Sequence, residues 1–214
     1  MIRANGATLQ YDDHGREVFA CREVDLEILP NEFVGILGPS GSGKSSLLYL
    51  LSGLKTPTGG EILYEGKNLA MLSDEQRAKL RLREFGFLFQ QPFLLGYLTA
   101  LENVLLAASG EPMRDKAVEL LKSLGLGEKT HRFPHELSGG ERQRVCVARS
   151  LLGNPKVVFA DEPTAALDHK NGQHVVELLN HHREGGALVM VTHDETMLEK
   201  ADRVLRIVEG QLVS

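Results

Sequence analysis

Hydrophobic and polar positions along this chain predict strands that alternate with helices. Partial alternation of apolar and polar residues in 8–11 and 18–29 is typical of strands with one buried face. Short, mostly apolar runs, typical of parallel strands buried on both faces, fill 32–38, 86–90, 156–160 and 187–192. The remaining predicted strands are 61–64 and a C-terminal hairpin of 203–208 and 211–213.

Six segments are predicted to be helices, and three of them follow one another without a strand between them. The predicted helices are 44–54, 73–84, 99–108, 113–124, 138–152 and 172–184. Ser73 and Gln76 form a predicted capping box at the start of the second. We therefore predict an α/β fold. Its mostly parallel sheet core, with N-terminal antiparallel strands, comes from 1–90 and 155–214, and an all-helical subdomain is inserted at 91–154.

The composition excludes several classes of protein. Of the 214 residues, 42% are hydrophobic and 25% are charged, which allows a core of normal size and excludes disordered, collagen-like and disulfide-stapled chains. A net charge of −5 argues against a nucleic-acid partner. Cys21 and Cys146 are far apart in sequence, so we expect two buried thiols. No stretch has the ~20 apolar residues of a membrane span, and the N-terminus does not resemble a signal peptide.

A glycine-rich segment between a predicted strand and a predicted helix indicates phosphate binding. It fits the pattern G-x-x-x-x-G-K-[ST] with Gly38, Pro39, Ser40, Gly41, Ser42, Gly43, Lys44 and Ser45. Glycines let backbone N–H groups curl around a phosphate, and the helix that begins near Lys44 directs its positive end at the same anion. Lys44 would reach the β- and γ-phosphates, and the Ser45 hydroxyl would bind Mg²⁺. The sequence therefore predicts a P-loop nucleoside triphosphatase.

Two acidic residues follow the apolar run 156–160 and complete this site. Asp161 would hold Mg²⁺, through water, at the end of a strand beside the P-loop. Glu162 projects in another direction and would orient or deprotonate the attacking water. The alternative, a polar strand end that faces solvent, does not explain two adjacent acids beside a P-loop.

The segment Leu137–Ser138–Gly139–Gly140–Glu141 has two interpretations. As structure, Ser138 and Glu141 form a capping box that starts a helix. As chemistry, the paired glycines leave bare N–H groups at the helix start, which could bind a second anion.

Together these motifs resemble those of the ATP-binding cassette (ABC) ATPases, in the family's order and over essentially the whole chain. The resemblance rests on the P-loop, the LSGGE signature, the Asp–Glu strand end and His193 after the strand 187–192. It implies an active ATPase with ATP and Mg²⁺ as cofactors. Within the chain, it makes Gln90 a contact of Mg²⁺ and of the attacking water, and His193 a contact of the γ-phosphate. Tyr11 is the candidate for the aromatic ring that stacks on adenine.

The resemblance also implies that each ATP site is shared by two copies of the chain. In the family, the signature residues Ser138, Gly139, Gly140 and Glu141 bind ATP held by the other subunit. Asp168 matches the family's residue at the dimer seam. ATP would then close a head-to-tail homodimer, and hydrolysis would reopen it.

Three positions depart from the family's usual residues. Ser46 stands where threonine is usual, Glu141 replaces a common glutamine, and Ala166 replaces a common serine. None of these changes removes a phosphate contact, so we expect an active enzyme.

The segments 86–104 and 160–168 look most like the lipoprotein-release and macrolide-export group of bacterial ABC ATPases. That resemblance implies a separate integral membrane permease as partner and a peripheral location on the cytoplasmic side of the membrane. A regulatory ATPase of the cell-division type and the ATPase of an importer share the same motifs, and both remain alternatives. The apolar segment 93–98 is either core of the helical subdomain or a groove for a permease helix.

Overall fold

The computed structural model describes residues 1–108, 112–183 and 185–213. Within these ranges the strands are β1 (Ile2–Asp13), β2 (Arg16–Ile28), β3 (Phe33–Leu37), β4 (Gly59–Tyr64), β5 (Lys67–Asn68), β6 (Phe85–Leu88), β7 (Val157–Asp161), β8 (Ala187–Thr192), β9 (Arg203–Val208) and β10 (Gln211–Val213). The α-helices are α1 (Lys44–Leu51), α2 (Asp74–Glu84), α3 (Ala100–Leu105), α4 (Arg114–Ser123), α5 (Gly139–Leu151) and α6 (His169–His182). Short 3-10 helices span Leu69–Met71, Gly127–Lys129, Pro134–Glu136 and Glu195–Leu198. Every predicted element is present, while Glu184 and Ser214, the last residues of a predicted helix and of the chain, lie outside the described residues.

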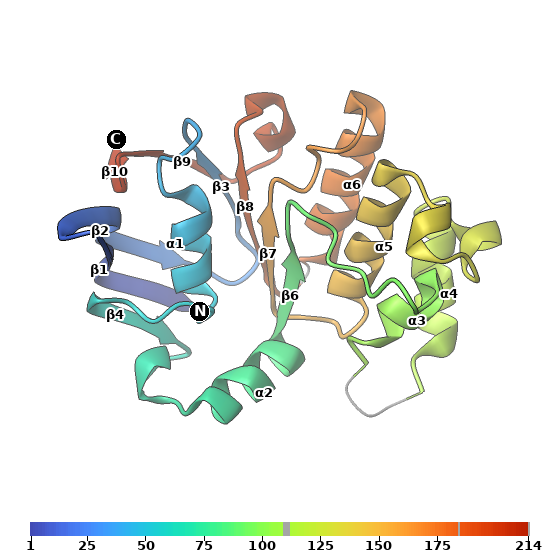
Figure 1. The fold of residues 1–214 in the computed structure, drawn as a ribbon, viewed down its shortest axis with the longest axis horizontal. Coiled ribbons are helices and arrows are strands. Elements are labelled where there is room, and N and C mark those ends of the chain that lie inside the picture. Colours follow the sequence, from blue (N-terminus) through green and yellow to red (C-terminus); the bar gives the residue numbers. More distant parts are fainter. Residues whose placement is uncertain (109–111, 184, 214) are drawn as a thin grey trace.

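The strands form two sheets, with β1, β2 and β4 at the left of Figure 1 and β3, β8, β7 and β6 in its middle. An antiparallel sheet has the order β2-β1-β4-β5. The second sheet has the order β10-β9-β3-β8-β7-β6, in which every neighbouring pair is parallel except β10 with β9. This arrangement confirms the predicted α/β core with antiparallel strands near the N-terminus.

Side chains on the parallel strands alternate between two apolar clusters, one on each face of the sheet. On β7, Val158 and Ala160 belong to the cluster that includes α3, α4, α5 and α6. Val157 and Phe159 belong to the cluster that includes α1 and the antiparallel sheet. All residues of β7 are buried, because both faces of the strand are covered. Double coverage explains why these strands read as uninterrupted apolar runs in the sequence.

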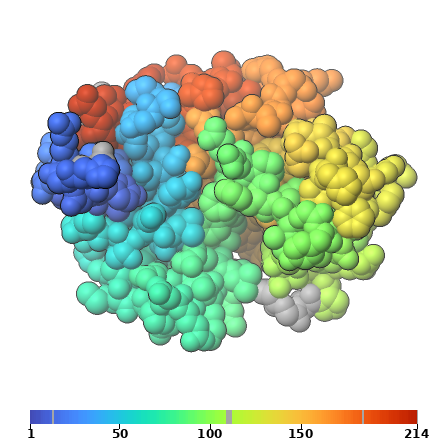
Figure 2. All heavy atoms as spheres, viewed as in Figure 1, coloured from blue at the N-terminus to red at the C-terminus, as the bar shows by residue number. Residues whose placement is uncertain are grey.

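The helical insert covers one face of the parallel sheet, opposite to the face that α1 and the antiparallel sheet cover. Figure 1 shows α3, α4 and α5 together on the right, and Figure 2 shows their side chains as one green and yellow body. Capping boxes start α2, α3 and α5, each with a Ser or Thr hydroxyl that accepts the backbone N–H three residues later. The predicted box at Ser73 and Gln76 is therefore confirmed.

The strand predicted at 86–90 ends earlier than expected. β6 ends at Leu88, and the carbonyl of Phe89 accepts a hydrogen bond from the side chain of Gln143 on α5, at 3.2 Å. The segment leaves the sheet at this point, so Gln90 lies in a loop with an exposed side chain.

Two other expectations concern the cysteines and the membrane. Cys21 and Cys146 are both buried and both free, as predicted. In the part of the chain that the structure describes, no helix combines the length and apolar character that a membrane span requires.

Candidate nucleotide-binding site

A cleft of about 660 Å³ opens at the carboxyl ends of the parallel strands. The loops after β3, β6, β7 and β8 all reach it, because parallel strands end at the same edge of a sheet. Nine of the predicted site residues line it: Ser40, Gly41, Gly43, Lys44, Ser45, Ser46, Gln90, Glu162 and His193. Residues from four loops, separated by up to 153 positions in the sequence (Ser40 to His193), therefore meet in one cleft.

The P-loop packs so closely against its neighbours that two of its glycines have no room for a side chain. A Cβ at Gly43, whose φ is +102°, would lie 2.1 Å from the carbonyl oxygen of Ala20. A Cβ at Gly38 would lie 2.3 Å from the carbonyl oxygen of Ile207. The Ser42 hydroxyl is buried without a hydrogen-bond partner in the structure. Glycines at these positions let the backbone turn and pack this tightly, as the loop of a phosphate cradle requires.

Lys44 occupies the centre of this loop. Its ammonium group donates hydrogen bonds to the carbonyl oxygens of Gly38 at 2.8 Å and Pro39 at 2.9 Å. The side chain is 92% buried, since only 8% of its surface is accessible. No ion pair neutralises it among the described residues. A buried cation held by two neutral carbonyls is well suited to an incoming phosphate.

Asp161, the last residue of β7, is held by two hydroxyl groups from α1. Ser45 Oγ donates to Asp161 Oδ1 at 2.9 Å, and the Tyr49 hydroxyl donates to Asp161 Oδ2 at 3.2 Å. Burial raises the pKa of the Asp161 carboxyl above its ordinary value, while these two hydrogen bonds act in the opposite direction. A cation would relieve the cost of keeping this carboxylate charged in a buried place.

The candidate ligands Ser45 and Asp161 suit magnesium better than a metal ion whose ligands are all protein side chains. The described residues contain no group of three or more His, Cys, Asp or Glu side chains that could hold a metal ion. Mg²⁺ usually keeps several waters and binds one or two protein oxygens together with substrate phosphates. Ser45 Oγ and Asp161 fit that pattern.

Glu162 lies at the bottom of the cleft and contacts the end of β8. Its Oε2 lies 2.9 Å from His193 Nδ1 and accepts a hydrogen bond from Thr192 Oγ1 at 3.2 Å. The Glu162 backbone has a φ of +47°, which is rare for a residue with a Cβ, and its N–H donates to the Val191 carbonyl at 2.9 Å. This left-handed turn separates Glu162 from the adjacent Asp161, as the sequence argument expected.

The signature residues lie outside the cleft formed by their own chain. Ser138, Gly139, Gly140 and Glu141 are absent from its lining. The side chains of Ser138 and Glu141 instead form the helix cap, in which the Ser138 hydroxyl accepts the Glu141 N–H at 3.3 Å and the Glu141 carboxylate accepts the Ser138 N–H at 2.8 Å. Glu141 also forms an ion pair with Lys129. The capping interpretation is thus confirmed, and these residues do not line the cleft of their own chain.

Asp168 is also outside the cleft. Its carboxylate caps α6 by accepting the backbone N–H of Asn171 at 3.0 Å, and these hydrogen bonds hold its pKa below the ordinary value. A Cβ at Gly140 would approach the Leu167 side chain at 3.0 Å, so the signature and the segment before Asp168 pack together.

Tyr11 does not line the cleft. It lies on β1, is 42% exposed and pairs across the sheet with Val18, which does line the cleft. Within the described part of the chain, the phenyl ring that lines the cleft is Phe19, which stacks against the Arg22 guanidinium at 4.3 Å. Sequence reasoning missed Phe19, since an aromatic residue on a strand usually packs in the core.

Sequence reasoning also missed Tyr49 and Thr192. Thr192 could have been identified as the residue directly before His193. Tyr49 gives no such signal, because its partner Asp161 lies 112 positions away in the sequence.

Comparisons with known proteins agree over the whole chain. The family model described as "ABC transporter" matches residues 21–165. An ABC transporter ATP-binding protein of Methanocaldococcus jannaschii, MJ1508, is 41% identical, and the alignment covers 100% of this chain and 98% of that protein. The macrolide export ATP-binding/permease protein MacB of Wolinella succinogenes is 42% identical over 99% of this chain but only 34% of its own length.

A solved structure has the same fold. The dimeric structure of a post-hydrolysis state of the ATP-binding cassette MJ0796, bound to ADP and Pi, has a TM-score of 0.95 and 38% sequence identity, and covers 100% of this chain and 97% of that one. This chain spans about a third of the length of MacB.

Proposed function

This chain belongs to the ABC transporter family as an ATP-binding and ATP-hydrolysing subunit of the group that includes MacB and MJ0796, and we propose that two copies close around ATP to drive a separate membrane permease. One observation carries the proposal of two copies. The cleft holds the P-loop, Glu162 and His193, while the bare helix start at Ser138 to Gly140 lies outside it. A second copy facing head to tail would bring that helix start to the open side of each cleft.

Each residue in or beside the cleft then has a separate role in ATP hydrolysis. The Gly38–Ser45 backbone and Lys44 would hold the phosphates, and Ser45 and Asp161, with Gln90 from the loop after β6, would hold Mg²⁺. Bound magnesium offsets negative charge on the phosphate oxygens. Glu162 accepts the proton of the attacking water, and His193 holds Glu162 in place while its exposed ring faces the γ-phosphate. Tyr11 remains the proposed adenine contact, and Phe19, which lines the cleft, is a second candidate.

The oligomeric state tests this proposal. Glu162→Gln protein in excess Mg-ATP should have twice the monomer mass by multi-angle light scattering, whereas the same protein with ADP should be monomeric. A double variant, Glu162→Gln with Ser138→Arg, should remain monomeric with ATP, because the added side chain blocks the helix start. A Glu162→Gln protein that stays monomeric in Mg-ATP contradicts the proposal.

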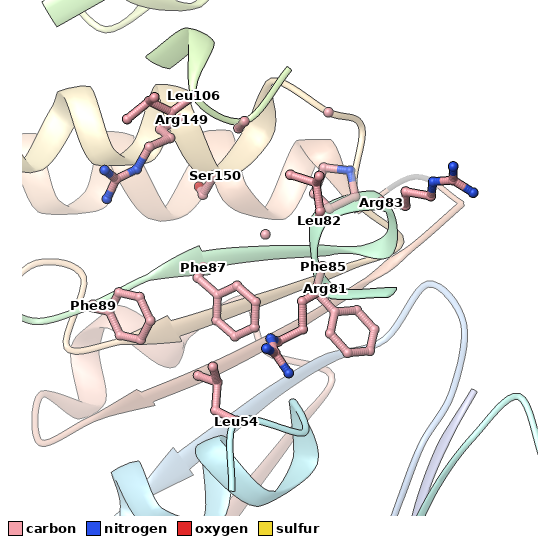
Figure 3. A pocket seen from close by; sticks show the side chains of 14 residues that line it. Leu54, Arg81, Leu82, Arg83, Phe85, Phe87, Phe89, Leu106, Arg149 and Ser150 are labelled. Carbon is pink, nitrogen blue, oxygen red and sulfur yellow. The ribbon is translucent and has the colours of Figure 1, made fainter. Parts of the chain in front are cut away.

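A groove beside β6 is the proposed docking site for the permease. This groove, of about 400 Å³, is lined by the rings of Phe85 and Phe87 on β6 and of Phe89 just after it, with Arg81 and Arg149 also in the lining (Figure 3). Apolar rings flanked by arginines suit a cytoplasmic helix with an apolar face and acidic edges.

Exposed apolar residues extend this surface beyond the groove. Phe93 is 61% exposed and its ring lies 5.6 Å from that of Phe89, while Tyr97 is 75% exposed. Leu94, in contrast, packs against the core. Leu94 thus anchors the segment 93–98 to the core, and the proposed role of its exposed side chains is to contact the permease.

We further propose that the permease works in export or lipoprotein release, at the cytoplasmic side of the membrane, and that the subdomain boundaries lie near 90 and 155. Tagged Glu162→Gln protein with Mg-ATP can capture its partner from detergent-solubilised native membranes, for identification by mass spectrometry. A permease with a large extracytoplasmic domain supports export. A cell-division protein supports the regulatory alternative instead.

A further inference from the structure

Tyr49 is placed to control the geometry of the magnesium carboxylate. It lies four residues after Ser45 on α1, and residues four apart share one face of a helix. The two hydroxyls hold different oxygens of one carboxylate, Ser45 at Oδ1 and Tyr49 at Oδ2. Asp161 is 3% exposed, so little water can replace either hydrogen bond.

We propose that Tyr49 is a positioning residue for magnesium, which acts by fixing the orientation of the Asp161 carboxylate. This inference deepens the proposed ATPase function and rests on it. A carboxylate held at one oxygen can still rotate about its Cβ–Cγ bond. A second hydrogen bond, to the other oxygen, removes that freedom before the metal arrives. Residues that orient a metal ligand in this way contribute to metal affinity without touching the metal.

The ring of Tyr49 packs against Phe89, one of the rings that line the groove. Its centroid lies 6.3 Å from that of Phe89, at an interplanar angle of 60°, which is an edge-to-face contact. Phe89 stacks on Phe87 at 5.7 Å, and both rings line the groove in Figure 3. The Phe89 carbonyl is also bound by Gln143 of α5. Groove, Phe89, Tyr49 and Asp161 thus form one continuous set of contacts.

Through this set of contacts, a structural change in the groove can reach Asp161, the proposed magnesium ligand. An occupant that moves the Phe89 ring also moves the ring against which Tyr49 packs. The hydrogen bond from the Tyr49 hydroxyl to Asp161 Oδ2 then changes its geometry, and with it the orientation of the proposed metal ligand.

The chain offers a matched control for the hydroxyl. Tyr64 also donates to a carboxylate, Glu84 Oε2, at 3.1 Å, on the antiparallel sheet and outside the lining of the ATP cleft. Tyr49→Phe and Tyr64→Phe each remove one phenol hydroxyl and keep the ring.

The first test measures metal binding rather than activity. Mn²⁺ is titrated into the ADP complex of each variant and followed by electron paramagnetic resonance. We expect Tyr49→Phe to weaken Mn²⁺ binding on the order of 10-fold, and Tyr64→Phe to leave it unchanged. Calorimetry with ADP in EDTA should give the same affinity for all three proteins. Equal Mn²⁺ affinity in Tyr49→Phe and wild type would overturn the inference. Failure of wild-type protein to hydrolyse ATP would instead contradict the proposed function.

The second test follows the ring contact. The chain has four tyrosines, so 3-fluorotyrosine labelling gives four ¹⁹F resonances, which Tyr→Phe variants assign. Phe89→Leu should shift the Tyr49 resonance and weaken Mn²⁺ binding, because the ring that supports Tyr49 is removed. A Phe89→Leu protein in which both are as in wild type would show that Phe89 does not hold Tyr49.

Discussion

His193 Nδ1 lies 2.9 Å from Glu162 Oε2, which joins an exposed ring to a buried carboxylate. The His193 side chain is 69% exposed and that of Glu162 only 10%. One side chain can therefore meet a nucleotide at the cleft surface while it restrains the other below. Thr192 adds a hydrogen bond to the same Glu162 oxygen, so two neighbours hold one end of the carboxylate.

Replacing Glu162 should separate binding from hydrolysis. Glu162→Gln keeps the shape of the side chain but removes the proton acceptor, so we expect kcat to fall about 10²–10⁴-fold. Single-turnover phosphate release measures the rate, and calorimetry should give an ATP affinity close to that of wild type. Glu195→Gln, at a surface residue paired with Arg206, is the control and should keep full activity. A rate for Glu162→Gln within threefold of wild type contradicts the assigned role.

The P-loop should not tolerate a methyl group at Gly43. Gly43→Ala would place a Cβ 2.1 Å from the Ala20 carbonyl oxygen, so the loop must move and nucleotide affinity should be lost. Gly66 is the matched control, since its φ of +74° is also left-handed but nothing lies within 4 Å of a new Cβ. Gly66→Ala should cost only about 1–2 kcal/mol of stability and leave ATP binding intact. Calorimetric ATP titration and urea unfolding distinguish the two, and similar nucleotide affinities would show that the contact at Gly43 is unimportant.

The exposed residues beside the groove should matter to the permease but not to ATP. Phe93→Ser with Leu95→Ser should weaken capture of the permease while isolated ATP binding survives, because both side chains lie at the surface. Leu94→Ser, whose side chain packs against the core, should instead destabilise the whole protein. Pull-down from solubilised membranes and thermal unfolding give the two readouts. Equal loss of capture and ATP binding in the Phe93 and Leu95 variant would indicate misfolding and reject the docking role.

Stability should depend on pH through His182. Burial lowers the pKa of His182 below its ordinary value of 6.5, and the nearby Lys116 and His181 act in the same direction. Just below pH 6.5, His182 therefore binds a proton in the unfolded chain but not in the folded chain. The free energy of unfolding falls as pH falls for this reason.

Urea unfolding between pH 7.5 and 5.5 measures this effect. His182→Gln should show a smaller loss of stability over that range than wild type. An exposed histidine, His131, provides the control, and His131→Gln should retain the wild-type pH dependence. Identical pH profiles for wild type and His182→Gln would show that burial of His182 has no energetic consequence.

Much of the fold follows from local patterns. The run 156–160 was recognisable as a buried strand because both of its faces are covered, and the capping box at Ser73 depends only on residues three apart. Likewise, the P-loop lies between β3 and α1, as its strand–loop–helix context predicted. These features are encoded within short segments, so a single sequence contains the information they need.

Features that depend on distant partners were less accessible. The early end of β6 involves the side chain of Gln143, 54 positions from Phe89, and the role of Tyr49 involves Asp161. The position of Tyr11 outside the cleft lining depends on how β1 and β2 pair and twist. No periodicity along the chain specifies such contacts, because they form only when the complete sheet brings the segments together.

The placement of the signature helix outside its own cleft has a consequence for inheritance. In the proposed pair of copies, a substitution of Lys44 inactivates the ATP site of the subunit that carries it. A substitution of Ser138 instead inactivates the ATP site of the other subunit. When normal and defective subunits are made in equal amounts and pair at random, only about one pair in four is fully normal. In the other three at least one site is damaged, so a defective allele should lower the ATPase rate even beside a normal one. Two alleles with damage in different motifs should partly rescue each other, since a mixed pair retains one complete site.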